Sequence, residues 1–492
     1  MTRTLTARWL VEYARRPLNL VLLVAVPVVF VTLSAGALSD FADILGGVSN
    51  LGEVEAATAG WAAAVLAGVA AFFQVSLSRD ADRRLAAAGA GAVRVVFSRL
   101  FSTLALALLA SVGSLVALGA RTDLPTTPRV VGATVLFALI YMGIGLTVGA
   151  LVRSEMNGSL IVVFAWIFDV FFGPAMGGSA WFIRLFPLHY PTLVITDVAS
   201  GHSGALGDLG ISFLWAAIAM SVAMVSLNAT TRISHRTRVR RPPGLHRAIV
   251  ALVAATRQLR RMPVMWILIV GLPVAFITAS IAVTPDDPTP VELVENGRRG
   301  LEIVPMSDVH GAVMVPITIG FLASLAGLFV ILDSAQADRR LSLTRFRPSE
   351  ILTVRMIVIA TASLVAAAVS IAVTAVSFDP VSWPTFVFAS VLVALTYATI
   401  GAIVGPLFGR LGGLYFLLVL PFIDIGLAQN AMFDAAPPAW GRFLPAHGAV
   451  RVMMDGAFTA SLDETRALIL AIGWLVALWV AAVAVFRRVA VS

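Results

Sequence analysis

The chain has 492 residues, of which 59% are hydrophobic and 13% are charged, and its mean hydropathy is +0.93. Soluble proteins carry about 25% charged residues, so this composition excludes an ordinary soluble domain and predicts a polytopic membrane protein. No cysteine is present, which excludes disulfides, thiolate chemistry and cysteine metal sites. The formal net charge is +8 at pH 7, and it comes from arginine alone because the sequence contains no lysine.

The lack of lysine is typical of a GC-rich genome, such as an actinobacterial one, and it limits the chemistry of nucleotide binding. The phosphate-binding loop G-x-x-x-x-G-K-[ST] places its lysine on the β- and γ-phosphates, so this chain has no standard site of that kind. We therefore expect any ATP-driven work to come from a partner. The six histidines are scattered without H-E-x-x-H spacing, which argues against a metalloenzyme.

Apolar runs of about 20 residues, the length that crosses a bilayer, recur along the chain and predict about twelve transmembrane helices. The first run is full length and lacks a small-residue cleavage site, so we do not expect it to be a signal peptide. The expected spans are 17–35, 60–78, 100–120, 130–151, 158–175, 209–228, 263–283, 309–332, 355–377, 385–408, 411–429 and 466–486.

Arginine placement predicts which loops are cytoplasmic, because Lys and Arg gather on that side. Arginines precede the first span and follow the last, whereas the loop after the first span holds only acids. The connection 229–262 carries nine arginines and no acid. We therefore expect this connection and both termini in the cytoplasm. The basic run is interpreted as a topology signal near anionic headgroups and not as a nucleic-acid site.

The sequence also predicts a tandem repeat. The segment RRPLNLVLLVAVPVVFVTLS at 15–34 is matched by RRMPVMWILIVGLPVAFITAS at 260–280, and ADRRL at 81–85 recurs at 337–341, an offset of 256. Further matches follow in the same order: Tyr141, Gly145 and Gly149 with Tyr397, Gly401 and Gly405; Asp169 with Asp424; and Pro187-x-His189 with Pro445-x-His447. Six spans in each half give both halves the same orientation, which is a 6+6 parallel repeat about an axis along the membrane normal.

The expected organisation is a first six-span domain at 1–230, a basic cytoplasmic linker at 231–262 and a second six-span domain at 263–492. Within each half, the connection between the fifth and sixth spans (176–208 and 430–465) is apolar but interrupted by Gly and Pro. Irregular backbone at membrane depth must be covered by protein. We therefore expect re-entrant outer hairpins in these two connections.

This arrangement resembles the permeases of type-2 ATP-binding-cassette (ABC) exporters, with two six-span domains fused in one chain. The resemblance covers essentially the whole chain and depends on loop architecture and the repeat. It implies two amphipathic lead-in helices, TRTLTARWLVEYARR and GLHRAIVALVAATRQLRR, and two ATPase-coupling segments, SRDADRRLAAAGAGAVRVVFSR and DSAQADRRLSLTRFRPSEILTVR. Many members of that family are single six-span chains that dimerise, so fusion here permits the two halves to differ.

What the resemblance implies about function is transport and not catalysis. The chain would be the permease of an exporter in the bacterial cell membrane, moving a drug-like, antibiotic or lipid substrate outward by alternating access. Two copies of a separate ABC ATPase would bind ATP and Mg²⁺, and this chain would hold no cofactor. Membrane lipids and the small-molecule or lipid substrate would be its other partners, and no nucleic acid is expected.

Two other classes remain open from the sequence. A proton-coupled secondary transporter of the major facilitator type also has twelve spans in two parallel halves. Its motif G-x-x-x-D-[RK]-x-G-[RK]-[RK] fits poorly, since aligning its last bases on Arg83 and Arg84 puts Asp82 at a glycine position and reverses the charges at Arg79 and Asp80. A membrane enzyme acting on lipids is less supported, because no paired carboxylate or nucleophile–base set stands out.

The repeated ADRRL segment carries the coupling candidates. An acid and two bases on a short cytoplasmic helix can pair with charges of a partner and orient it. The alternative interpretation is a topology signal, which needs the arginines but not the same order twice. The candidate coupling residues are Asp82, Arg83, Arg84, Asp338, Arg339 and Arg340.

Asp169 and Asp424 lie inside expected spans and are candidates for the substrate pathway, together with Tyr141 and Tyr397. A carboxylate in mid-membrane is costly and is a functional candidate by default. The alternative interpretation is that each aspartate caps or pairs within the adjoining outer hairpin. Four glycines form two G-x-x-x-G stripes, for which helix packing is the expected role: Gly145, Gly149, Gly401 and Gly405.

Overall fold

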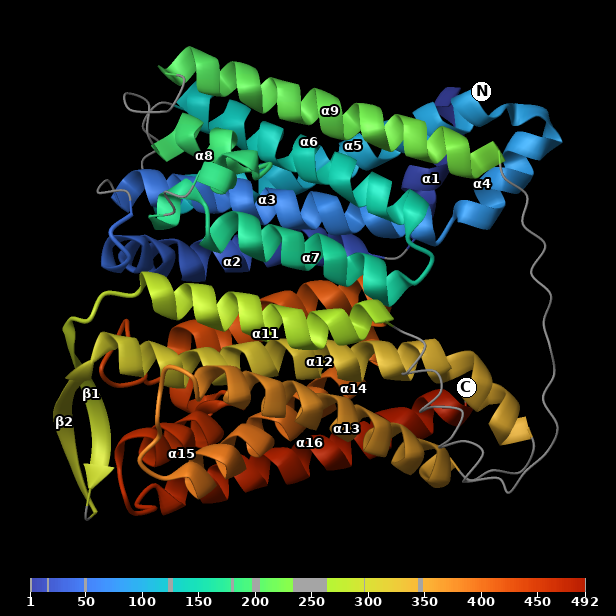
Figure 1. Cartoon of the computed structure of the whole chain (residues 1–492). Coiled ribbons are helices and arrows are strands. Elements are labelled where there is room, and N and C mark those ends of the chain that lie inside the picture. The colour runs from blue at the N-terminus through green and yellow to red at the C-terminus, as the bar shows by residue number, and fades with distance from the viewer. Residues whose placement is uncertain are drawn as a thin grey trace. The chain divides into compact units, whose positions relative to one another are not determined.

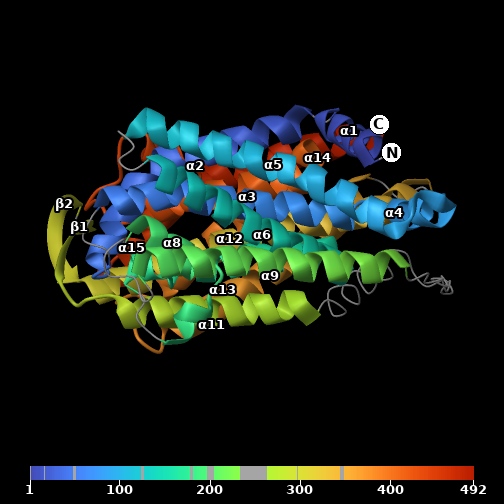
Figure 2. The ribbon, with the colours of Figure 1, turned by 90° about the horizontal axis from the view of Figure 1, so that it is seen from above.

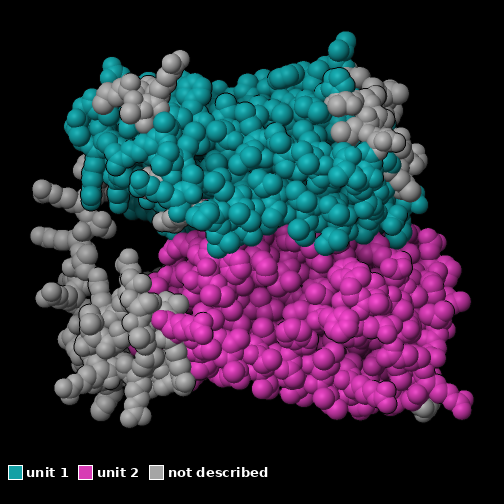
Figure 3. Space-filling view, turned by 180° about the vertical axis from the view of Figure 1, so that it is seen from behind, with its two compact units in different colours: residues 1–240 teal, residues 241–492 magenta. Residues whose placement is uncertain are grey.

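The computed structural model describes residues 2–15, 17–47, 51–122, 127–177, 181–196, 204–232, 263–295, 297–343 and 348–491. The chain forms two compact units, unit 1 (residues 1–240) and unit 2 (residues 241–492), coloured separately in Figure 3. In the described ranges the regular structure is helical apart from one β-hairpin, which confirms the predicted helical class. Most of the predicted linker, with the second lead-in helix, lies outside the described residues.

Unit 1 is a bundle of long apolar helices with shorter helices at its ends. Helices α1 and α4 lie at one end, which we call the α4 end, and α8 lies at the other (Figures 1 and 2). The helices are α1 (Thr2–Ala14), α2 (Pro17–Ile44), α3 (Leu51–Ser76), α4 (Arg79–Leu85), α5 (Ala92–Arg121), α6 (Thr127–Leu151), α7 (Glu155–Phe171), α8 (His189–Thr196) and α9 (Gly204–Arg232). A π-helical turn (Ala86–Ala90) follows α4, and 3₁₀ turns occupy Pro174–Met176 and Trp181–Leu185.

Unit 2 is a second helical bundle, with a β-hairpin and α15 at the end opposite the chain's C-terminus (Figures 1 and 2). Its elements are α11 (Pro263–Val283), β1 (Pro288–Glu295), β2 (Arg298–Pro305), α12 (Met306–Leu343), α13 (Pro348–Thr374), α14 (Trp383–Pro421), α15 (His447–Phe458) and α16 (Thr465–Val491). A π-helical turn (Phe422–Ala428) continues α14, and Gly441–Phe443 forms a 3₁₀ turn.

Nine helices of the described ranges are long and apolar enough to cross a membrane, so the chain is a multi-pass membrane protein. The sequence predicts about twelve spans, and three elements account for the difference. Helix α7 has only 17 residues. In α11, the apolar stretch whose residues are described is Ile269–Ala282, which is also short. Helix α14 is counted once although Gly409, at φ +69°, breaks its helical geometry.

Helix α3 is the central helix of unit 1, and its spanning segment is entirely buried. Its small residues allow close approach of α6, where a Cβ on Gly145 would overlap the backbone of Gly68. In unit 2, a Cβ on Gly401 of α14 would likewise overlap the carbonyl oxygen of Ser324 in α12. Because lipid gives helices no hydrophobic reason to associate, such backbone contacts are a main source of packing energy in membranes.

The second glycine of each stripe lies in a looser contact. A Cβ on Gly149 would be 2.9 Å from the carbonyl oxygen of Phe72, whereas a Cβ on Gly405 would be 3.3 Å from that of Leu328. The closest helix approach is therefore at the first glycine of each stripe.

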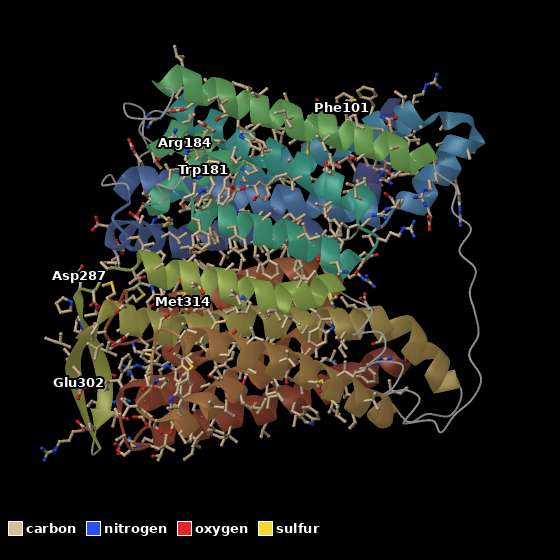
Figure 4. All side chains as sticks on the ribbon, in the orientation of Figure 1. Phe101, Trp181, Arg184, Asp287, Glu302 and Met314 are labelled. Atoms are coloured by element: carbon tan, nitrogen blue, oxygen red, sulfur yellow. The ribbon has the colours of Figure 1, made fainter. Side chains whose placement is uncertain are left out.

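The β-hairpin of unit 2 lies between α11 and α12 and was not predicted from the sequence. Strands β1 and β2 pair antiparallel, with Glu295 opposite Arg298 around a turn at Gly297, which has φ +74°. Val291 and Leu293 of β1 are buried, and Ile303 of β2 is 74% exposed. Asp287 and Glu302 are labelled at this end of unit 2 in Figure 4. The alternating pattern VELVE and GLEIV was the available signal.

The close contact between α6 and α3 gives a testable prediction. Replacing Gly145 by Ala inserts a methyl group into the backbone of Gly68, so we expect overpacking to destabilise the protein by about 1–3 kcal/mol. Thermal unfolding of the purified chain in detergent measures this. The matched control is Gly132→Ala in the same helix, where a Cβ meets nothing within 4 Å. Equal unfolding temperatures for the two variants would contradict the packing role.

Candidate functional site

Helix α4 contains the first ADRRL segment and lies at the α4 end of unit 1 (Figure 2). Asp80 and Asp82 are in its first turn and Arg83 and Arg84 in its last, the order that complements the helix dipole. The helix ends where Gly89 (φ +97°) and Gly91 (φ +75°) turn the chain into α5. These positive φ angles need glycine, so the local sequence dictates a short helix followed by a tight turn.

Asp82 points into the protein and pairs with Arg99 of α5. Arg99 donates from Nε to Oδ2 and from Nη2 to Oδ1 of Asp82, both over 2.8 Å. Arg99 Nη1 also donates to Oε1 of Gln74, at the end of α3, over 3.1 Å. Both charged residues are buried. A two-pronged pair of this kind fixes orientation as well as distance, so α4, α3 and α5 are held together at this point.

Trp9 of α1 completes this arrangement, which we call the Arg99 cluster (Trp9, Gln74, Asp82 and Arg99). The guanidinium carbon of Arg99 lies 3.8 Å from the centroid of the buried Trp9 ring. An arginine over a tryptophan face is attracted to the ring's negative face. Trp9 also packs with Ala90 and Val95, so the amphipathic N-terminal helix is attached to the same cluster.

Two further arginines on or beside ADRRL bind the ends of other helices. Arg83 Nε donates to the carbonyl oxygen of Thr230 in α9 over 2.9 Å. Arg79 Nη2 donates to the carbonyl oxygens of Gly149 and, over 2.6 Å, Val152 at the end of α6. Carbonyls at helix C-termini lack partners within the helix, and cations are favourable there. Burial lowers the pKa of Arg79 from its ordinary value, and repulsion from Arg83 adds to this.

The structure therefore separates the residues of the first ADRRL segment. Asp82 is buried, Arg83 is half-buried and Arg84 is exposed to solvent. The side chains of Asp338, Arg339 and Arg340, near the end of α12, lie outside the described residues. The sequence analysis did not predict the roles of Gln74, Trp9 and Arg79. The signal for the ion pair was the 17-residue spacing from Asp82 to Arg99, repeated from Asp338 to the buried Arg355.

Asp169 in α7 lies in a second buried cluster, near the opposite end of unit 1. Tyr141 of α6 donates its hydroxyl to Oδ2 of Asp169 over 2.6 Å. The backbone N–H of Leu188, just before α8, donates to Oδ1 over 3.2 Å. The carboxylate thus binds the start of the short helix α8, and Asp169 is 4% exposed.

Unit 2 contains a matching cluster around Asp424. Tyr397 of α14 donates to Oδ2 of Asp424 over 2.6 Å, and the N–H of Ala446, just before α15, donates to the same oxygen over 2.9 Å. His447 Nδ1 lies 2.8 Å from Oε1 of Gln429. Burial is the main cause that lowers the pKa of His447 to about 4. Each aspartate thus binds the backbone just before a short helix, α8 in unit 1 and α15 in unit 2.

Buried and partly buried ion pairs, which were not predicted from the sequence, join elements at the α8 end of unit 1 and the α15 end of unit 2. In unit 1, Arg129 pairs with Glu53 over 3.6 Å and donates to the carbonyl oxygen of Ile195 at the end of α8. In unit 2, Arg451 of α15 pairs with Glu464 over 2.6 Å and with Glu292 of β1 over 3.3 Å. Figure 4 places Trp181 and Arg184 at this α8 end of unit 1.

No group of three or more His, Cys, Asp or Glu side chains in the described part of the chain could hold a metal ion. A scan against models of protein families finds no match, and a search of the curated proteins finds no similar sequence.

The Arg99 cluster gives a direct prediction for stability. Replacing Asp82 by Asn leaves the guanidinium of Arg99 buried without its anion, and breaking a buried ion pair in this way costs about 3–5 kcal/mol. The unfolding temperature measured in detergent should therefore fall strongly in Asp82→Asn.

Asp80→Asn is the control on the same helix. The Asp80 side chain is 84% exposed and lies 3.5 Å from Arg83, so its loss should change stability by about 0–1 kcal/mol. If the two variants unfold at the same temperature, Asp82 and Arg99 do not hold this end of unit 1 together.

Proposed function

We propose that this chain is the permease of an ABC-type exporter, in which α4 receives the movement of a separate ATPase. The observation that carries the proposal is the attachment of α4 to five other helices of unit 1. Asp82 binds α5 and, through Arg99, the ends of α3 and α1; Arg83 binds α9, and Arg79 binds the end of α6. A push on α4 is transmitted to all of them, because rigid polar contacts leave it little independent motion.

This geometry assigns different tasks within ADRRL. Asp82 and Arg83 are engaged by their own chain, so they would transmit movement and not contact the partner. Arg84 is exposed, as are Ala87, Ala88 and Gly89 in the turn that follows α4. These residues would form the surface on which the ATPase docks, with ATP and Mg²⁺ bound on that partner.

Twelve spans in two equivalent halves are the topology that we propose. The nine candidate spans become twelve when α7, α11 and the part of α14 beyond Gly409 are added. The Tyr141–Asp169 and Tyr397–Asp424 hydrogen bonds, each 2.6 Å long, support a tandem repeat. The short helices α8 and α15 would be re-entrant elements on the outer side, and α4 and both termini would be cytoplasmic.

The substrate we propose is a drug-like, antibiotic or lipid molecule moved outward, and two ATPase copies would bind to the chain. We assign Asp169 and Asp424 to holding the outer helices and not to contact with the substrate. Each carboxylate accepts hydrogen bonds from a tyrosine and from the backbone at the start of a short helix in its own unit. In Asp424 both donors reach Oδ2, and the buried Oδ1 has no hydrogen-bond partner among the described residues.

The test of the exporter assignment has two steps: a search of the neighbouring reading frames for an ABC ATPase, and a measurement of its association with this chain. Co-purification of the two proteins and vanadate-sensitive ATP hydrolysis in vesicles are the expected results. Arg84→Glu should weaken association by about tenfold or more, since reversing a charge at an interface replaces attraction by repulsion. Arg488→Glu is the control, because Arg488 is also exposed but lies at the end of α16.

Two outcomes would contradict this proposal. If Arg84→Glu and Arg488→Glu bind the ATPase equally well, α4 is not the docking surface. If transport is abolished by a protonophore and indifferent to vanadate, the chain is a proton-coupled secondary transporter of the major facilitator type.

The structural role of the aspartates is tested by transport. Replacing both Asp169 and Asp424 by Asn places an amide where donors converge, so we expect lower thermal stability, by about 1–3 kcal/mol at each site. Uptake of cationic and neutral compounds into inverted vesicles should fall in parallel. A loss confined to cations would show instead that the carboxylates line the substrate pathway.

A further inference from the structure

Unit 2 contains an apolar cavity of about 270 Å³ between α13, α14 and α16. Each helix contributes three residues to its wall, among them Ala360 of α13, Ala398 and Thr399 of α14, and Trp479 of α16. None of the nine lining residues is charged. The hydroxyl of Thr399 donates to the carbonyl oxygen of Leu395 over 2.7 Å, so it is already satisfied. The wall therefore suits hydrocarbon.

The cavity lies between three spanning helices and opens on the exposed side of α16. Val476 and Trp479 of its wall are 57% and 43% exposed, and only 11% of the spanning segment of α16 is buried. Trp479 is 14 residues after the start of α16 at Thr465, about 21 Å along the helix. Tryptophan normally gathers at the membrane interfaces, so a ring at this depth beside a cavity is unusual.

Unit 1 fills the corresponding space with its own side chains. At the offset of 256 that relates Tyr141 to Tyr397, Ala360 corresponds to Leu104 and Ala398 to Met142. Leu104 and Met142 belong to a hydrophobic cluster that also contains Met220 and Ala223 of α9. At two positions of the cavity wall, unit 2 therefore has alanine where unit 1 has a larger side chain.

A third difference between the units, at Thr399 of α14, affects how closely α16 can approach. Thr399 corresponds to Gly143 of unit 1, where α9 approaches so closely that a Cβ would lie 2.7 Å from the Cβ of Ala219. A threonine side chain at this position excludes such an approach. The wall residues on α16 are larger than their counterparts, since at the same offset Leu475 corresponds to Ala219 and Trp479 to Ala223. The space is therefore bounded by alanines on α13 and α14 and by large side chains on α16.

We propose that this groove between α13, α14 and α16 binds the hydrocarbon chain of a membrane lipid. The exposed face of α16 belongs to a candidate membrane span, for which lipid chains are the surrounding medium. An unfilled space beside them forfeits the dispersion contacts that its wall could make. In a membrane such packing, and not removal from water, drives association. The site is independent of the proposed ATPase, and unit 1 is expected to lack it.

The experiment fills the groove with the residues of unit 1. The full chain is purified in mild detergent, mixed with dioleoyl phosphatidylglycerol, washed and examined by native mass spectrometry. The parent protein should retain one lipid, and Ala360→Leu with Ala398→Met should lower its occupancy about tenfold, because the added side chains take the place of several methylene groups. The converse variant, Leu104→Ala with Met142→Ala in unit 1, should retain an additional lipid.

A second measurement covers the case in which the filled variant does not fold. The protein is placed in vesicles of phosphatidylcholine brominated in mid-chain, and its fluorescence is compared with that of Trp479→Phe. The chain has ten tryptophans, and the difference between the two signals comes from the ring of Trp479 alone. Quenching of this signal should fall clearly in the single variant Ala360→Leu. Equal retention and equal quenching in parent and filled proteins would overturn the proposal, as would retention of a small apolar molecule in place of the lipid.

Discussion

The α4 end of unit 1 depends on a buried positive charge that must be neutralised inside the protein. Arg99 lies on a spanning helix, where an unpaired guanidinium is costly. Asp82 supplies the anion in two hydrogen bonds, Gln74 accepts a third and the ring of Trp9 covers the remaining face. Three consecutive helices, α3, α4 and α5, and the more distant α1 are therefore held together by the need to neutralise one charge, and α4 takes its position from the others.

At the other end of each unit, a buried aspartate has a comparable task with a different partner. Asp169 and Asp424 each accept one hydrogen bond from a tyrosine and one from the backbone at the start of a short helix. Backbone groups in an apolar setting need partners, and the carboxylate provides one where the chain breaks between helices. Polar clusters thus lie at both ends of unit 1 and at the α15 end of unit 2, while glycine contacts such as Gly145 with Gly68 bring the helices together between them.

Much of this arrangement could be predicted from the sequence. Hydropathy indicates a multi-pass helical protein, and the spacing of Tyr141 from Asp169 and of Tyr397 from Asp424 indicates related clusters. The exposure of Arg84 and the burial of Asp82 could not be predicted, because three neighbouring charged residues look alike until Arg99 is placed. The hairpin 288–305 was missed because the long apolar runs on either side of it dominate the hydropathy of this region. The cavity of unit 2 could not be predicted, because it depends on how the helices pack. The sequence does show, at the offset of 256, that Ala360 corresponds to Leu104 and Ala398 to Met142.

The central claim is that the Asp82–Arg99 pair fixes α4 against the spans, and a distance measurement tests it directly. The chain has no cysteine, so spin labels can be placed at Ala87 in the turn after α4 and Leu151 at the end of α6 without background. Both positions are exposed. Pulsed electron paramagnetic resonance in vesicles should give a narrow distance distribution for the parent and a broad one when Asp82 is replaced by Asn. An equally narrow distribution in that variant would contradict the claim.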